Sequence, residues 1–192
     1  EENGIPIDYI TGTSAGAIVG SLYAMGYTPE EMVELMLSEE FSYWQTGTVE
    51  NEYKYYFKRP DPTPEFGHFS IDMTDSLQVK ASFLPQSLIN PIQMNQAFMA
   101  LFSQATAKAG WNFDNLFVPF RCVASDIYSK KAIIFKNGDL GDAVRASMTF
   151  PFFFQPIWKD SVPIFDGGQF PGRPDEGGFP SGLHLRFDCG RR

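Results

Sequence analysis

Ser14 lies where a serine hydroxyl could act as a nucleophile. Gly12 and Gly16 flank it in a G-x-S-x-G pattern, which is typical of a nucleophile elbow. The residues before it favour a strand and those after it favour a helix, so we expect the hydroxyl at a sharp turn before a helix. Free N–H groups at a helix N-terminus stabilise developing negative charge, and the backbone N–H of Ala15 is the expected first oxyanion donor.

The same residues also allow a purely structural interpretation. G-x-S-x-G is short enough to occur by chance, and Gly12, Gly16 and Gly20 could form a small-residue ridge at an ordinary strand-to-helix turn. A nucleophile elbow needs a strand before the serine and a helix after it, and both are predicted here. We therefore favour a nucleophilic Ser14.

The composition indicates one globular domain with an acidic charge balance. The 192 residues are 43% hydrophobic and 16% aromatic, with 19 phenylalanines, and the net charge is −8. This charge argues against nucleic-acid binding, which needs a basic face. It also disfavours electrostatic docking on anionic lipid, although not hydrophobic docking. Cys122, Cys189, His68 and His184 show no metal-type spacing, so we expect no metal site.

The N-terminal residues suggest that the chain is not a whole protein. It begins at Glu1 without an initiator Met, and residues 1–4 resemble the end of a helix. The sequence contains neither a signal peptide nor an apolar run long enough to span a bilayer. We expect an N-terminus that is processed or cut from a longer protein.

The first half of the chain predicts helices around an irregular aromatic segment. Thr28, Pro29 and Glu31 form the start signal of a second helix, with a capping box. The expected elements are helices at 15–25, 28–37 and 91–109, strands at 68–73 and 77–83, and an irregular, proline-containing stretch at 41–66. We interpret 41–110 as an inserted α+β region over the catalytic core. It is either a cap that receives an acyl chain or a structural subdomain with its own small core.

The second half predicts short strands around one helix. The expected elements are strands at 117–124, 132–135 and 163–165, a helix at 139–147, and an apolar run at 150–154 that Pro151 interrupts. The last of these strands ends at Asp166-Gly167-Gly168. A carboxylate at such a strand end can point into a cleft beside a close backbone turn.

Three segments together resemble the patatin-like phospholipase family, and bacterial members in particular. They are residues 12–16, residues 138–147 with Pro151 following, and residues 166–168, in the family's order. The resemblance implies an α/β fold: a three-layer α/β/α sandwich with a mostly parallel central sheet, whose catalytic domain covers 1–168. It also implies a Ser-Asp dyad without histidine, in which Ser14 is the nucleophile and Asp166 its base, with Gly167 and Gly168 as part of the motif.

Asp166 needs the support of its context to be read as a base. A carboxylate with an ordinary pKa near 4 is a poor base for a serine hydroxyl, so it must be positioned tightly beside a well-held oxyanion. Asp-Gly-Gly alone is more often a plain turn. With the other two segments present, we favour catalysis.

Two departures from the family pattern affect the expectation. Family members carry a glycine-rich loop upstream of the elbow that completes the oxyanion hole, and this chain starts after that point. We expect the missing segment to lower activity and to leave an open sheet edge. Residues 169–192 are rich in Gly and Pro without periodicity, so we expect an atypical, disordered tail that is not native family sequence beyond about Phe170.

Two rival interpretations stay open at this stage. Ser14, Asp166 and His184 follow the chain order of an α/β-hydrolase triad, although His184 lies in the expected unstructured tail. Alternatively the chain is a non-catalytic fragment that binds lipid or a partner, because its oxyanion loop is absent.

The favoured function is a lipid acyl hydrolase of the phospholipase A type, which acts through an acyl-enzyme intermediate. The expected partner is a lipid or phospholipid substrate, with transient contact to a membrane surface, and no cofactor is needed. The residues do not show the compartment; for a bacterial member of the family the alternatives are the cytoplasm and the cell envelope, peripheral to a membrane. Four phenylalanines are candidates for the acyl pocket: Phe150, Phe152, Phe153 and Phe154.

Overall fold

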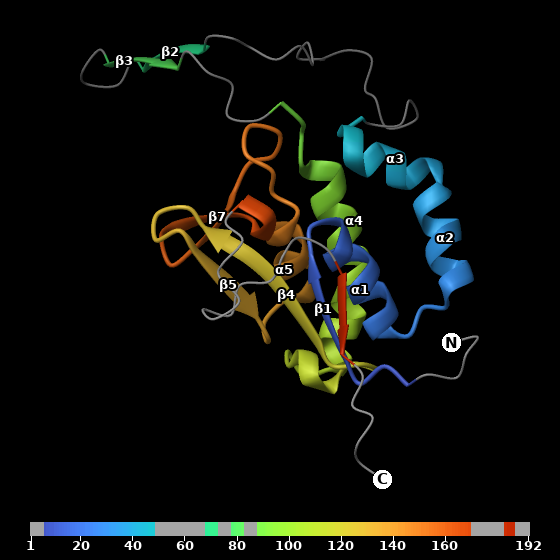
Figure 1. Cartoon of the computed structure of the whole chain (residues 1–192). Helices are drawn as coiled ribbons and strands as arrows, with labels where there is room; N and C mark the ends of the chain where they lie inside the picture. The colour runs from blue at the N-terminus through green and yellow to red at the C-terminus, as the bar shows by residue number, and fades with distance from the viewer. Residues whose placement is uncertain (1–5, 49–67, 73–77, 83–87, 170–182, 187–192) are drawn as a thin grey trace.

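The computed structural model describes residues 6–48, 68–72, 78–82, 88–169 and 183–186. It is a mixed α/β structure with one six-stranded sheet and one two-stranded hairpin. The main sheet follows the hydrogen-bonded path β6-β7-β4-β1-β8, and β5 also pairs with β4. Figure 1 shows α4 and α5 in the centre of the molecule, with α2 and α3 along one side.

The described elements have the following bounds. The main sheet contains β1 Tyr9–Thr13, β4 Phe120–Asp126, β5 Lys131–Phe135, β6 Ile157–Lys159, β7 Val162–Asp166 and β8 Leu183–Arg186. The hairpin contains β2 His68–Asp72 and β3 Gln78–Ser82. The α-helices are α1 Ala15–Met25, α2 Pro29–Leu37, α3 Glu39–Thr46, α4 Ile92–Lys108 and α5 Leu140–Ser147.

The expectation of a mostly parallel sheet is wrong. Among the described strands only β1 and β4 pair in parallel, whereas β1–β8, β4–β5, β4–β7 and β6–β7 are all antiparallel. Two of these pairs are tight hairpins, and a short connection forces neighbouring strands to run in opposite directions. The chain between β1 and β4 contains several helices, which gives it the length that a parallel crossover requires.

Helices α1 and α5 pack on the same face of the sheet. Gly12 and Cys122 are register partners in the parallel pair, so their side-chain positions face the same way. Gly12 lies against α1 at Ala17, and the Cys122 thiol donates a hydrogen bond to the Ala143 carbonyl of α5. The three-layer arrangement stays a prediction, because these contacts define one helical layer.

Helix α4 belongs to the main core. Its Met94, Phe98 and Phe102 are buried in the same cluster as Ile10 of β1 and Leu22 of α1. The helical part of the expected insertion therefore does not form a small core of its own. It supports the elements that carry Ser14.

Local sequence signals predict α2 correctly, but they miss α3. The Thr28 hydroxyl accepts a hydrogen bond from the Glu31 N–H, and the Glu31 carboxylate accepts one from the Thr28 N–H, as the capping box predicts. Residues 41–46, which were expected to be irregular, continue a helix that the Ser38 side chain caps. The remaining expectation for this segment falls largely on residues 49–67, outside the described part.

Strand β8 bears on the expectations about the sheet edge and the tail. Strand β8 pairs antiparallel with β1 along its free edge, from Tyr9 opposite Arg186 to Gly12 opposite Leu183. The β1 edge is thus paired within the described residues, and the tail forms a strand at Leu183–Arg186. The other residues after Gln169 lie outside the described part. None of the described helices is long and apolar enough to cross a membrane.

The place of α4 in the core can be tested by truncating one buried ring. Phe102→Ala should lower the free energy of unfolding by about 3–5 kcal/mol, because it leaves a cavity in the shared core. Met99→Ala on the same helix is the control, since Met99 is 66% exposed, and it should change stability by less than about 1 kcal/mol. Denaturant unfolding should show one cooperative transition for both. A separate early transition in Phe102→Ala would contradict the single core.

Candidate active site

Ser14 has the strained backbone of a sharp strand-to-helix turn. Its φ is 56° and its ψ is −128°, a region that residues other than glycine rarely adopt. The residue is half-buried between β1 and α1, and Ala15, at the start of α1, is exposed. A side chain at Gly12 would collide with the Gly16 carbonyl oxygen and come within 2.7 Å of the Ala17 Cα. The turn therefore needs glycine at position 12.

The ends of β1 and β7 meet on one edge of β4. Cys122 and Val123 of β4 pair with both β1 and β5, and Ala124 to Asp126 pair with both β5 and β7. Because a strand residue can pair once on each edge, β1 and β7 must share the edge opposite β5. The two strands run toward each other along that edge. Their carboxyl ends therefore converge.

Asp166 lies at this junction, where β7 ends next to the end of β1. Thr13 is opposite Val123 and Asp166 is opposite Ala124, so the two strand ends are offset by one residue of β4, or about 3.4 Å along the strand. A Cβ at Gly167 would lie 2.9 Å from the Thr13 methyl carbon and 2.6 Å from the Val123 carbonyl oxygen. The Asp-Gly-Gly turn therefore contacts the residue that precedes Ser14.

The Asp166 side chain is buried and held by backbone groups. It is 7% exposed, and its Oδ1 accepts a hydrogen bond of 2.8 Å from the Gly168 N–H. Its own N–H donates to the Thr149 carbonyl at 2.8 Å. Within the described residues the Ser14 hydroxyl and the Asp166 carboxylate do not hydrogen-bond directly. Catalytic hydrogen bonds are often long before substrate binds, so the absence of a direct hydrogen bond is compatible with Asp166 as the base for Ser14.

Ser147 contacts the elbow from the end of α5, and the sequence did not single it out. Its fully buried Oγ accepts a hydrogen bond of 2.9 Å from the Ser14 N–H and donates one of 2.6 Å to the Val123 carbonyl. Ser147 is the last residue of the segment 138–147 that carries the family resemblance. That segment marks Ser147 as part of the family motif. Its contacts with Ser14 and Val123 depend on how β1 pairs with β4, which the segment does not encode.

Arg145, in the same segment, fixes the loop after α5. Its guanidinium donates to the Asn95 side chain at 2.9 Å, to the Thr149 hydroxyl at 2.7 Å and to the Gln155 carbonyl at 3.1 Å. It also lies over the Phe154 ring, 5.0 Å from its centroid. Burial lowers the pKa of Arg145 to about 10. This buried cation holds Thr149, whose carbonyl accepts the Asp166 N–H.

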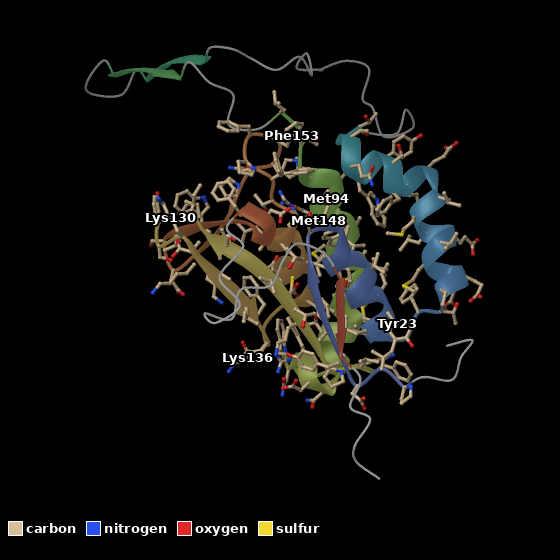
Figure 2. All side chains as sticks on the ribbon, viewed as in Figure 1. Tyr23, Met94, Lys130, Lys136, Met148 and Phe153 are labelled. Carbon is tan, nitrogen blue, oxygen red and sulfur yellow. The ribbon has the colours of Figure 1, made fainter. Side chains whose placement is uncertain are left out.

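The four predicted pocket phenylalanines separate into two groups. Phe154 is buried in the main core beneath Arg145. Phe150, Phe152 and Phe153 are exposed, with Phe152 75% accessible, and the Phe150 and Phe153 rings contact each other edge to face. Figure 2 shows Phe153 at the upper end of the main body, whereas Met148 lies nearer its middle. Two surface hollows among the described residues, one near α4 and one near Trp111, are lined by residues other than these phenylalanines.

Both histidines lie in described strands. His184 is part of β8, where its backbone pairs opposite Thr11, so it lies in a strand of the main sheet. His68 begins β2 of the hairpin. Among the described residues no group of three or more His, Cys, Asp or Glu side chains could hold a metal ion.

Comparisons with known proteins identify the family. The model of the patatin-like phospholipase family matches residues 1–174. The chain belongs to the patatin-like phospholipase family. It is 25% identical over 178 residues to human patatin-like phospholipase domain-containing protein 6, covering 91% of this chain and 10% of that protein. It is also 25% identical over 169 residues to lysophospholipase NTE1 of Pyricularia oryzae, covering 88% of this chain and 9% of that protein.

The relatives of this patatin-like chain are much longer than the chain itself. It spans about a tenth of the length of these two proteins. An NTE family protein of Mycobacterium tuberculosis is 25% identical over 168 residues, covering 87% of this chain and 36% of that protein. Identity is the same for the human, Pyricularia and mycobacterial relatives, so the narrower resemblance to bacterial members stays a prediction.

The contact of the Asp-Gly-Gly turn with β1 and β4 can be tested at Gly167. Gly167→Ala should lower the free energy of unfolding by about 1–3 kcal/mol, because the added methyl has no room beside Val123 and Thr13. Gly141→Ala is a milder comparison: its Cβ would be 3.1 Å from its nearest neighbour, and alanine gains helix propensity in α5. Equal stability losses in urea unfolding would contradict the close approach of Gly167.

The buried thiol beneath the junction gives a second test. Burial raises the pKa of the Cys122 thiol from 9.0 to about 12, so the folded state favours the protonated form. The stability that this group contributes is full below about pH 9 and is lost as the pH rises toward 12. The unfolding free energy measured relative to Cys122→Ala, in a Cys189→Ser background, should therefore fall between pH 8.5 and 10.5. A pH-independent difference would contradict the burial of this thiol.

Proposed function

We propose that this chain is the catalytic part of a lipid acyl hydrolase that uses Ser14 as nucleophile and Asp166 as base. The observation that carries the proposal is the meeting of β1 and β7 on one edge of β4, with Thr13 opposite Val123 and Asp166 opposite Ala124. The two residue types needed for acyl transfer thus lie at converging strand ends, with Ser14 directly after β1 and Asp166 as the last residue of β7. Membership of the patatin-like phospholipase family supports a lipid ester as the substrate class.

The proposed reaction proceeds in two steps through one intermediate. Asp166 takes the proton from the Ser14 hydroxyl as its oxygen attacks the ester carbonyl, and the alcohol leaves with that proton. Water, activated by Asp166, then attacks the acyl-Ser14 ester and releases the fatty acid with a free serine. Both steps pass through a tetrahedral oxyanion. The N–H of Ala15 at the exposed start of α1 is its proposed donor within this chain.

The exposed phenylalanines are the proposed contacts for the lipid. Phe150, Phe152 and Phe153 follow Thr149, whose carbonyl holds Asp166, so their loop begins beside the proposed base. An apolar acyl chain would gain about 25 cal/mol for each Å² of apolar surface that it covers there. Phe154 is excluded from this role because Arg145 and the core already cover it.

The relatives' names support this choice of substrate without fixing its details. One relative is named a lysophospholipase, and others carry patatin-like phospholipase domains. The catalytic unit is proposed to cover residues 1–168, although the family match extends to residue 174. We infer a serine acyl hydrolase of carboxylic esters with transient access to a membrane surface.

Hydrolysis of a p-nitrophenyl ester and of a lysophospholipid tests the dyad. Ser14→Ala and Asp166→Asn should each lower kcat by about 1,000-fold or more, and the double variant should fall no further, because the two groups act as one unit. Ser21→Ala and Asp160→Asn are matched controls: Ser21 is buried within α1, and Asp160 is exposed at the β6–β7 turn. Both controls should retain activity.

The same assay separates the rival interpretations. It is run with this chain and with a form extended upstream by a glycine-rich loop, since such a loop would supply further oxyanion donors. His184→Ala should change kcat by less than about threefold, whereas a triad predicts a loss of several orders of magnitude. Full activity of Asp166→Asn, or inactivity of both folded forms, would contradict the proposal and favour lipid binding without catalysis.

A further inference from the structure

The hydrogen-bond ladder between β1 and β4 stops one bond earlier than its register allows. In a parallel pair, successive N–H donors of one strand recur every two residues. The Ile10 N–H donates to the Pro119 carbonyl at 2.9 Å, and the register continues from Ile10 opposite Phe120 to Thr13 opposite Val123. Two repeats later, the Ser14 N–H is therefore the expected donor to the Val123 carbonyl.

The Ser147 hydroxyl stands between these two groups. Its Oγ accepts from the Ser14 N–H at 2.9 Å and donates to the Val123 carbonyl at 2.6 Å, so one side chain satisfies both members of the missing bond. A single hydroxyl can do this because it has one donor and two acceptor lone pairs. The Ser147 oxygen therefore lies between the Ser14 N–H and the Val123 carbonyl of β4. Strand β1 accordingly ends at Thr13.

We propose that Ser147 is the positioning residue of the nucleophile, an inference that rests on the proposed function. The inserted hydroxyl holds Ser14 off the sheet in its strained conformation, with φ of 56° and ψ of −128°. Because the Ser14 N–H already donates to Ser147, the Ala15 N–H at the start of α1 is the donor that remains for an oxyanion. Without the hydroxyl, the Ser14 N–H and the Val123 carbonyl either close on each other or remain buried without partners.

The same short segment also places the proposed base. Two residues after Ser147, the Thr149 carbonyl accepts the Asp166 N–H at 2.8 Å, and Arg145 binds the Thr149 hydroxyl. The end of α5 thus contacts the nucleophile through Ser147 and the base through Thr149. A shift of either contact changes the spacing between Ser14 and Asp166, and a misplacement of about 1 Å can cost about 100-fold in rate.

The test compares three substitutions at Ser147 with a matched control, all in the ester-hydrolysing form of the protein. Ser147→Ala removes the hydroxyl, Ser147→Thr keeps it, and Ser147→Cys keeps its shape with a weaker hydrogen-bonding group. Ser21→Ala is the control, because Ser21 is equally buried but its hydroxyl bonds only to the Ile18 carbonyl within α1. Each variant is measured for kcat, KM, the rate of Ser14 phosphonylation by a fluorophosphonate, and thermal unfolding.

We expect Ser147→Ala to lower kcat and the phosphonylation rate by about 10- to 100-fold with KM within about twofold. For Ser147→Thr both rates should lie within about fivefold of the parent's. The rates of Ser147→Cys should lie between those of Ser147→Thr and Ser147→Ala, and those of Ser21→Ala should equal the parent's. Rates of folded Ser147→Ala within twofold of the parent would overturn the proposal. So would equal losses in Ser147→Thr and Ser147→Ala, and if Ser147→Ala does not fold, the order of the Thr and Cys variants decides.

A second readout keeps this inference separate from the catalytic proposal. The Ser14 amide can be followed by ¹⁵N–¹H NMR and hydrogen exchange in the parent and in Ser147→Ala. If the parent neither hydrolyses esters nor reacts with the fluorophosphonate, the proposed function fails, and the role of Ser147 in catalysis fails with it. A changed Ser14 amide signal would still support the hydrogen bond itself. An unchanged signal and exchange rate would overturn that contact as well.

Discussion

The structure depends on the sharing of one edge of β4 by two strands that approach from opposite directions. Strand β1 occupies the first half of that edge and β7 the second, while β5 pairs along the opposite edge from Cys122 to Asp126. Backbone pairing at about 4.8 Å leaves little freedom in where the two strand ends come to lie. Ser14 directly follows β1 and Asp166 is the last residue of β7, so the sheet determines where both residues lie.

Buried polar contacts from α5 stabilise this junction on its helical side. Ser147 satisfies the backbone groups that the interrupted ladder leaves open, and Arg145 ties the following loop to α4 through Asn95. Buried polar groups are costly unless their donors and acceptors are paired. The hydrogen bonds of Ser147 and Arg145 therefore restrain the positions of the residues that they join. The apolar core of α1, α4 and α5 keeps water away from them. The apolar core and these hydrogen bonds therefore both help to hold the ends of β1 and β7 in place.

Local features of the fold could be read from the sequence, whereas its long-range pairings could not. The capping box at Thr28 and the helix at residues 15–25 follow from signals within a few residues, and both predictions are confirmed. Strand direction and the role of Ser147 depend on which distant residues pair, which single-sequence periodicity does not encode. The four-residue strand β8 is too short for a pattern to form. The roles of Ser14 and Asp166 came from three motifs in combination, and they stay a prediction.

The most direct test is a crystal structure of the protein after reaction with a fluorophosphonate that mimics the tetrahedral intermediate. The account predicts a covalent adduct on Ser14 Oγ, an Asp166 carboxylate oxygen within about 3.5 Å of that atom, and the Ser14 N–H still bonded to Ser147 Oγ. An adduct on another residue would contradict it. So would a Ser14 adduct whose nearest base is the His184 imidazole, with Asp166 turned away.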